Sequence, residues 1–232
     1  MTASLIRRAR TFAVAGAVFL SATRAGAQNG RDFTPYVIPD RAAEVALART
    51  AAPRNVSDSA TILVLTRTGF VEASHGTNGF TCAVFRAFNG STGDANFWST
   101  KVRAPQCMNA AATRTMLPRT VKRTEWIMAN VAPADVDART KRAFASHEFS
   151  MPAAGAMAYM LSPEQYLVDD EPHRWMPHLM FFYDNSMPAS AWGAGGPKAP
   201  LIDGSSNDSS TPITTLLIPL PQWSDGTSSS AH

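Results

Sequence analysis

Two histidines and three acids lie close together in the second half of the chain, and their side chains are the best suited to chemistry. In order they are Asp169, Asp170, Glu171, His173 and His178. Imidazole and carboxylate groups are ligands that divalent transition metals accept. The stretch is therefore a candidate metal or ligand site, in which His173 and His178 would bind the metal and His147 could add a further imidazole.

The spacing of the two histidines limits how they could share a metal ion. His173 and His178 do not have the i, i+4 spacing that aligns two ligands on a helix, and on a strand their odd offset points them to opposite faces. Pro172 and Pro177 would have to bend the chain for both imidazoles to reach one ion. The alternative is that His178 is a hydrogen-bonded residue at the start of a strand and the acids form a solvated turn.

The two cysteines, Cys82 and Cys107, allow two kinds of chemistry. In an oxidising compartment they would form a disulfide, which stabilises a chain of this loop length by about 3 to 4 kcal/mol in the chain-entropy model. A thiol nucleophile is the alternative, with Cys82 facing His75 across a hairpin that turns at 78–79, or with Cys107 near a helix start and His178 as its base. The export signal described next favours the disulfide.

The first 27 residues have the layout of an export signal. Three arginines precede an apolar run at 11–22, and Ala25-Gly26-Ala27 follows it as a signal-peptidase site. The run is too short to span a bilayer, and no later run is long enough to do so. We expect cleavage after Ala27 and a periplasmic or extracellular protein. The pair Arg7-Arg8 leaves the twin-arginine route open, although Arg10 stands where that route normally has an apolar residue.

The net charge argues against a nucleic-acid partner. Lys and Arg number 21 and Asp and Glu 18, but residues 1–27 hold four arginines and no acid, which leaves 17 basic against 18 acidic side chains. Phosphate binding needs a concentrated positive surface. The strongest basic cluster that remains is Arg114, Arg119, Lys122 and Arg123. We expect it to be a solvated helix face, with an anionic ligand as the alternative.

Periodicity predicts one α+β domain at 28–232, an antiparallel sheet with helices on one face. Strands are expected at 61–66, 70–74, 80–88, 156–161, 179–183 and 213–220. Helical regions are expected at 40–52, 110–130 with a break at Pro118, and 133–146, and a short helix should begin at Ser162. Prolines place the last strand at an edge, and residues 28–39 and 227–232 should be loose.

Five motifs are spread over most of the chain after the signal. They are GTNGFTC at 76–82, FWSTKVRAPQCMN at 97–109, GAMAYMLSPEQYL at 155–167, WMPHLMFF at 175–182 and WSDGT at 223–227. Together they resemble a group of exported bacterial proteins of unassigned function. The resemblance implies one exported domain and gives no residue a catalytic or binding role.

No motif specific to one reaction or to a known cofactor occurs in the chain, and this favours a binding protein. There is no catalytic triad signature and no phosphate-binding loop. The leading hypothesis is a non-catalytic exported domain that binds a small molecule, a component of the cell envelope or another protein. The alternative is a metal-dependent or thiol hydrolase that uses the 169–178 region or a Cys/His pair.

Overall fold

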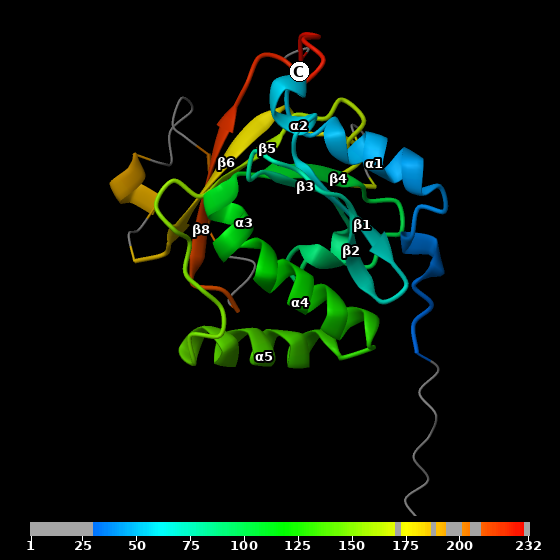
Figure 1. Ribbon diagram of the computed structural model, residues 1–232. Coiled ribbons are helices and arrows are strands. Elements are labelled where there is room, and N and C mark those ends of the chain that lie inside the picture. Colours follow the sequence, from blue (N-terminus) through cyan, green and yellow to red (C-terminus); the bar gives the residue numbers. More distant parts are fainter. Residues whose placement is uncertain (1–29, 170–172, 187–188, 194–200, 205–209, 230–232) are drawn as a thin grey trace, which may run out of the picture. The chain divides into compact units, whose positions relative to one another are not determined.

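One β-sheet runs through the centre of the fold (Figure 1). In the described part of the chain it has eight strands, in the order β2-β1-β3-β4-β5-β6-β8-β7. Neighbouring strands are antiparallel, apart from the parallel pair β1 and β3. The strands are β1 Thr61–Thr66, β2 Gly69–Ser74, β3 Thr81–Phe85, β4 Ala104–Met108, β5 Met157–Met160, β6 His178–Asp184, β7 Leu201–Gly204 and β8 Ile213–Pro219. The predicted α+β class is confirmed.

The computed structural model describes residues 30–169, 173–186, 189–193, 201–204 and 210–229. The sheet and its helices belong to one unit, Arg31–His232. The predicted signal peptide at 1–27 lies outside the described residues. Within these ranges no helix is both long enough and apolar enough to cross a bilayer.

The helices begin and end where the sequence offers caps. The Asp40 carboxylate accepts the Ala42 N–H at 2.8 Å to start α1, and the Asn109 amide oxygen accepts the Ala112 N–H at 2.9 Å to start α3. Pro118 lies in the first turn of α4. The described helices are α1 Arg41–Arg49, α2 Arg54–Ser57, α3 Ala110–Thr115, α4 Leu117–Met128 and α5 Pro133–Ala145, with 3-10 turns η1 Thr34–Tyr36, η2 Ala87–Asn89 and η3 Ala189–Trp192.

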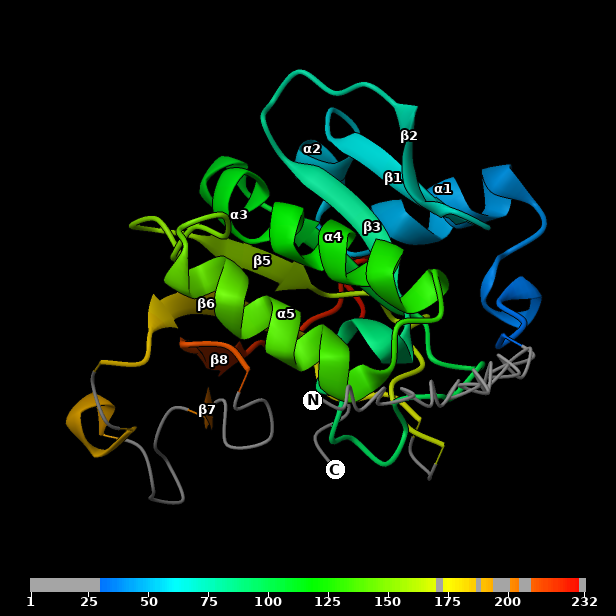
Figure 2. The same cartoon turned by 90° about the horizontal axis from the view of Figure 1, so that it is seen from below.

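Helices cover both faces of the sheet, whereas the sequence prediction placed all of them on one face. Cys82 and Val84 of β3 pack in a cluster with alanines of α1, and Ala83 and Phe85 pack in another with residues of α3 and α4. The helix α5 lies beside α4 (Figure 2). The physical reason is that β3 is buried at each of its five positions, so both of its faces need a cover.

The predicted hairpin at 78–79 is wrong. Strands β2 and β3 do not pair; β1 lies between them, and the two-residue turn is Arg67-Thr68, between the paired residues Thr66 and Gly69. Cys82 therefore neighbours Ile62 of β1 and is not opposite His75.

Asn78-Gly79 forms a turn, but the turn does not connect two paired strands as predicted. The Asn78 amide donates to the Val56 carbonyl at 2.7 Å and its oxygen accepts the Phe80 N–H at 3.0 Å. Gly79 adopts a φ of 78°. The turn therefore fastens a loop that returns the chain to run parallel to β1.

Three smaller predictions also differ from the structure. Ser162 begins a turn and no helix, with its hydroxyl accepting the Glu164 N–H at 3.1 Å. Strand β8 is not at the edge, because the unpredicted strand β7 pairs with it along 214–217. In the expected loose leader at 28–39, Phe33 and Tyr36 are buried in the core.

A fully buried ion pair connects the first part of the chain. Arg86 Nη2 lies 2.8 Å from Glu44 Oε1, and both side chains are at most 1% exposed. Arg86 also donates to the carbonyls of Tyr36 and Val84, and Glu44 Oε1 accepts the Leu65 N–H at 3.0 Å. Burial lowers the pKa of Arg86, and the Glu44 carboxylate acts in the opposite direction. One pair therefore joins η1, helix α1 and strands β1 and β3.

The cysteines form the predicted disulfide. Cys82 of β3 and Cys107 of β4 are directly opposite in the antiparallel register, and both side chains are fully buried. The bond closes the segment that contains η2 and residues 90–103.

Replacing Glu44 with Ala should lower the free energy of unfolding by about 3 to 5 kcal/mol, because the Arg86 guanidinium would stay buried without a counter-charge. Glu44→Gln should cost less, since its amide oxygen can still accept the Leu65 N–H. Urea unfolding followed by circular dichroism measures both. The control is Glu125→Ala, in an exposed pair with Lys122, which should cost at most about 1 kcal/mol. A loss for Glu44→Ala no larger than that control would contradict the role of the pair.

Replacing both cysteines with alanine should lower the free energy of unfolding by about 3 to 4 kcal/mol. The disulfide joins residues 25 positions apart, and without it the unfolded chain regains conformational entropy. The urea midpoint of the Cys82→Ala/Cys107→Ala variant measures the effect. Reductant should lower the midpoint of the parent and leave that of the variant unchanged. Equal midpoints for the oxidised parent and the variant would rule out a stabilising crosslink.

Candidate functional site

His178 is buried at the start of β6 and makes contacts of a structural kind. Its side chain is 3% exposed, Nδ1 donates to the Met176 carbonyl at 2.8 Å, and the ring packs edge-on against Trp175 at 4.7 Å between centroids. Burial lowers the pKa of His178, and the hydrogen bond to Met176 opposes this effect only in part. The ring is therefore neutral at pH 7.

The other predicted ligands in the described part of the chain each contact different neighbours and do not contact one another. His173 stacks on Tyr166 at 4.3 Å between ring centroids, the Asp169 carboxylate accepts the Ser99 hydroxyl at 3.1 Å, and His147 ends α5 with a φ of 60°. Among the described residues, no three His, Cys, Asp or Glu side chains come together as a metal site would need. Asp170 and Glu171 lie outside the described residues.

The cysteines offer no thiol nucleophile while their disulfide is intact. His75, the proposed partner of Cys82, lies on the surface with Nδ1 3.2 Å from Glu72 Oε1. Cys107 is bonded to Cys82 and has no thiol for His178 to deprotonate. The thiol alternative is thereby ruled out for the oxidised protein.

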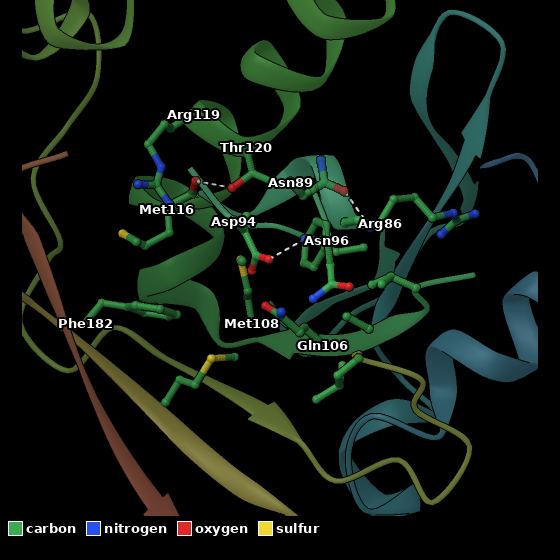
Figure 3. A pocket seen from close by; sticks show the side chains of 17 residues that line it. Arg86, Asn89, Asp94, Asn96, Gln106, Met108, Met116, Arg119, Thr120 and Phe182 are labelled. Carbon is green, nitrogen blue, oxygen red and sulfur yellow. Dashed lines mark hydrogen bonds between the residues drawn. The ribbon is translucent and has the colours of Figure 1, made fainter. Parts of the chain in front are cut away.

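A cavity of about 280 Å³ lies between α4 and the sheet, and none of the predicted histidines lines it. Alternate residues of β4 face it, and among them the small side chain of Ala104 leaves space below the helix. The floor and inner walls are apolar and are made chiefly by Phe85, Met108, Met116, Leu167, Met180 and Phe182. Figure 3 shows the cavity from close by, with Met108, Met116 and Phe182 labelled.

Polar side chains meet the cavity from three separate segments. Arg119 and Thr120 come from α4, Gln106 from β4, and Asp94 and Asn96 from the loop between η2 and β4. Asp94, Asn96 and Gln106 lie near one another, whereas Arg119 lies apart from them beside Met116 (Figure 3). This arrangement, an apolar body with a few convergent polar groups, is typical of small-molecule sites.

Some of these polar groups are used by the fold. Asn89 accepts the Arg86 N–H at 2.7 Å and donates to the Thr124 hydroxyl at 2.7 Å, and Thr120 donates to the Met116 carbonyl at 3.3 Å. Arg86 lines the cavity, but its guanidinium is bound to Glu44 and is fully buried.

Other polar groups have capacity left for a ligand. Within the described part of the chain, the carboxamides of Asn96 and Gln106 make no hydrogen bond. Each presents two N–H donors and one carbonyl acceptor. Asp94 Oδ1 accepts the Asn96 N–H at 2.7 Å, which holds that carboxylate in place.

The four residues of the predicted basic cluster lie in four different environments. Arg119 is half-buried and lines the cavity. Arg123 is buried and donates to the hydroxyls of Thr140 and Ser210 at 2.9 and 3.1 Å. Lys122 pairs with Glu125, and Arg114 is exposed. The expectation of a solvated face therefore fails for Arg119 and Arg123.

No protein-family model, no curated protein and no solved structure matches the chain. The candidate site is consequently argued from its own residues and their geometry.

Stability should fall with pH below about 6.5, because the unfolded chain takes up a proton on His178 more readily than the folded chain does. The loss begins near that ordinary value and is complete below the lowered pKa. His178→Gln should flatten the curve of unfolding free energy between about pH 7 and pH 5. His147→Gln, at an exposed histidine, is the control. An unchanged curve for His178→Gln would show that His178 is not the group responsible.

Proposed function

We propose that this chain is an exported, non-catalytic domain that binds a small molecule in the cavity between α4 and the sheet. The observation that carries the proposal is the pair of carboxamides, Asn96 and Gln106, without hydrogen bonds to the described residues above an apolar floor. The volume of about 280 Å³ is just below the range of about 300 to 1,000 Å³ of ligand pockets, so the ligand is small.

The lining favours binding over catalysis. Among its described residues there is no serine, cysteine or histidine, the side chains that most often act as nucleophile or base. Asp94 is the one carboxylate in the described part of the lining, and it is exposed. The amide and apolar groups support recognition of a ligand by hydrogen bonds and contact area.

Export is part of the same proposal. The pattern at 1–27 supports a secretory signal, and the Cys82–Cys107 disulfide fits a periplasmic or extracellular location. The five sequence motifs support membership in the exported bacterial group that they resemble. A fragment of the cell envelope and a small solute from outside the cell are both ligands that such a protein would meet.

Ala104→Leu should abolish ligand binding, because the added atoms project into the cavity where Ala104 lines it. Purified mature protein is screened by thermal shift against amino acids, sugars and envelope fragments, and each hit is repeated with the variant. Ala46→Leu, at an exposed position of α1, is the matched control and should keep every shift.

Two results would overturn the proposal. One is a hit whose shift survives in Ala104→Leu, since the ligand would then bind elsewhere. The other is the absence of any hit together with robust turnover of a substrate, since the chain would then be an enzyme.

A further inference from the structure

We infer that the ligand of this cavity is an uncharged planar ring that carries two amide units, as uracil and thymine do. The amide units bind the carboxamides of Asn96 and Gln106, and the ring lies on the apolar floor. The inference rests on the proposed function and names the class of ligand.

The charged side chains of the described lining leave no counter-charge for an ion inside the cavity. Arg86 is paired with Glu44 at 2.8 Å and has no exposed side-chain surface. Arg119 already has an interaction within the protein. Asp94 is exposed, so water weakens the field of its carboxylate. An ion that entered would lose its hydration without gaining an opposite charge, and this favours a neutral ligand.

Two carboxamides supply the polar recognition. Asn96 comes from the loop between η2 and β4 and Gln106 from β4, and the two side chains lie near one another (Figure 3). Both are half-buried, and neither side chain makes a hydrogen bond with the described residues. A polar group held partly out of water without a partner costs free energy, which a ligand that bonds to it restores.

The shape of a carboxamide selects an amide inside a ring. A carboxamide presents an N–H donor and a carbonyl acceptor side by side in one plane. A ring holds its own amide in the cis form, so its N–H and C=O also lie side by side and can make two hydrogen bonds with the carboxamide. Asn and Gln recognise the edges of DNA bases through paired hydrogen bonds of this kind. A ring with two amide units offers one to each side chain.

Both carboxamides are held in place before a ligand binds. The Asn96 N–H donates to Asp94 Oδ1 at 2.7 Å, and the next residue, Phe97, is buried and donates its N–H to the Asp94 carbonyl at 3.0 Å. Gln106 lies on β4, which has β3 and β5 as neighbours in the sheet. Little ordering of the backbone is therefore needed on binding.

The apolar floor favours an aromatic ring over a sugar, the other uncharged class that carboxamides bind. Met108, Met116 and Met180 line the floor, and Phe182 adds an aromatic ring. Methionine sulfur makes favourable contacts with aromatic rings, and aromatic rings pack on one another. A sugar would place hydroxyl groups against these side chains and lose their hydration without gaining hydrogen bonds.

Isothermal titration of the full mature protein with uracil, 2-pyridone and N,N′-dimethyluracil tests the inference. These flat rings carry two, one and no amide units with an N–H. Uracil should bind most tightly and dimethyluracil at least about tenfold more weakly, with 2-pyridone between them. Galactose should bind more weakly than uracil.

Uridine and uridine monophosphate identify the source of the ring. Tighter binding of uracil than of uridine would assign the site to a free base, and the reverse order would assign it to a nucleoside. The monophosphate should bind no more tightly than uridine, because its phosphate meets no available counter-charge in the described lining.

Two variants assign the hydrogen bonds to their residues. Gln106→Met and Asn96→Leu each replace a carboxamide with an apolar group of similar size. Each should weaken uracil by about tenfold and leave dimethyluracil nearly unchanged. Gln222→Met, at an exposed glutamine, is the matched control and should leave both affinities unchanged. Equal losses for uracil and dimethyluracil in both variants would show that the carboxamides act only in folding.

The outcomes for the cavity and for the ligand class are separable. If the amide rings do not bind while another compound shifts the parent and not Ala104→Leu, the ligand class is wrong and the binding cavity stands. If uracil binds equally to the parent and Ala104→Leu, the cavity itself is wrong. Equal affinity of the parent for uracil and dimethyluracil, or tighter binding of galactose or of the monophosphate than expected here, would also overturn the inference.

Discussion

The buried pair of Arg86 and Glu44 is the constraint on which the rest of this fold depends. A charge taken out of water is costly unless a partner meets it, so the segments that carry the two side chains must come together as the chain folds. Glu44 belongs to the helix on one face of the sheet, and the backbone of Arg86 leads into the loop that lines the cavity on the other face. The pair therefore fixes the position of the loop that forms the cavity wall, although the pair itself involves the helix on the opposite face of the sheet.

Six strands and the long helices were predictable because each has a local signal, whereas β4 and β7 were not predicted. Alternation and β-branched residues marked β1 and β8, and Asp40, Asn109 and Pro133 marked helix starts. Which strands pair with one another was harder to predict from the sequence. The Asn-Gly turn has the composition of a hairpin, yet its side-chain hydrogen bonds to Val56 and Phe80 make it the end of a crossover, and this depends on contacts with a distant segment. Strand β7 is short and obtains its pairing only from β8.

The candidate site was harder to foresee than the fold. Histidines and acids drew the sequence prediction to 169–178 because those residue types are common ligands, whereas His178 is a buried residue bonded to a backbone carbonyl. The cavity draws its polar groups from three segments, and only tertiary structure brings Asn96 and Gln106 together. One signal was present: Gln106 alternates with Ala104 and Met108 on the buried face of a strand, where a polar side chain needs a reason.

The two hydrogen bonds of Asn89 have a consequence for the kinetics of exchange between the cavity and solvent. The side-chain amide of Asn89 accepts from the Arg86 backbone and donates to Thr124 of α4, so it links the helix to the loop that lines the cavity. A molecule that enters or leaves does so most readily without lifting α4, past the segment 91–96 and its exposed Asp94. A ligand could then exchange through rearrangement of a few loop residues, a motion of nanoseconds to microseconds, without the slower separation of the helical layer from the strands beneath it.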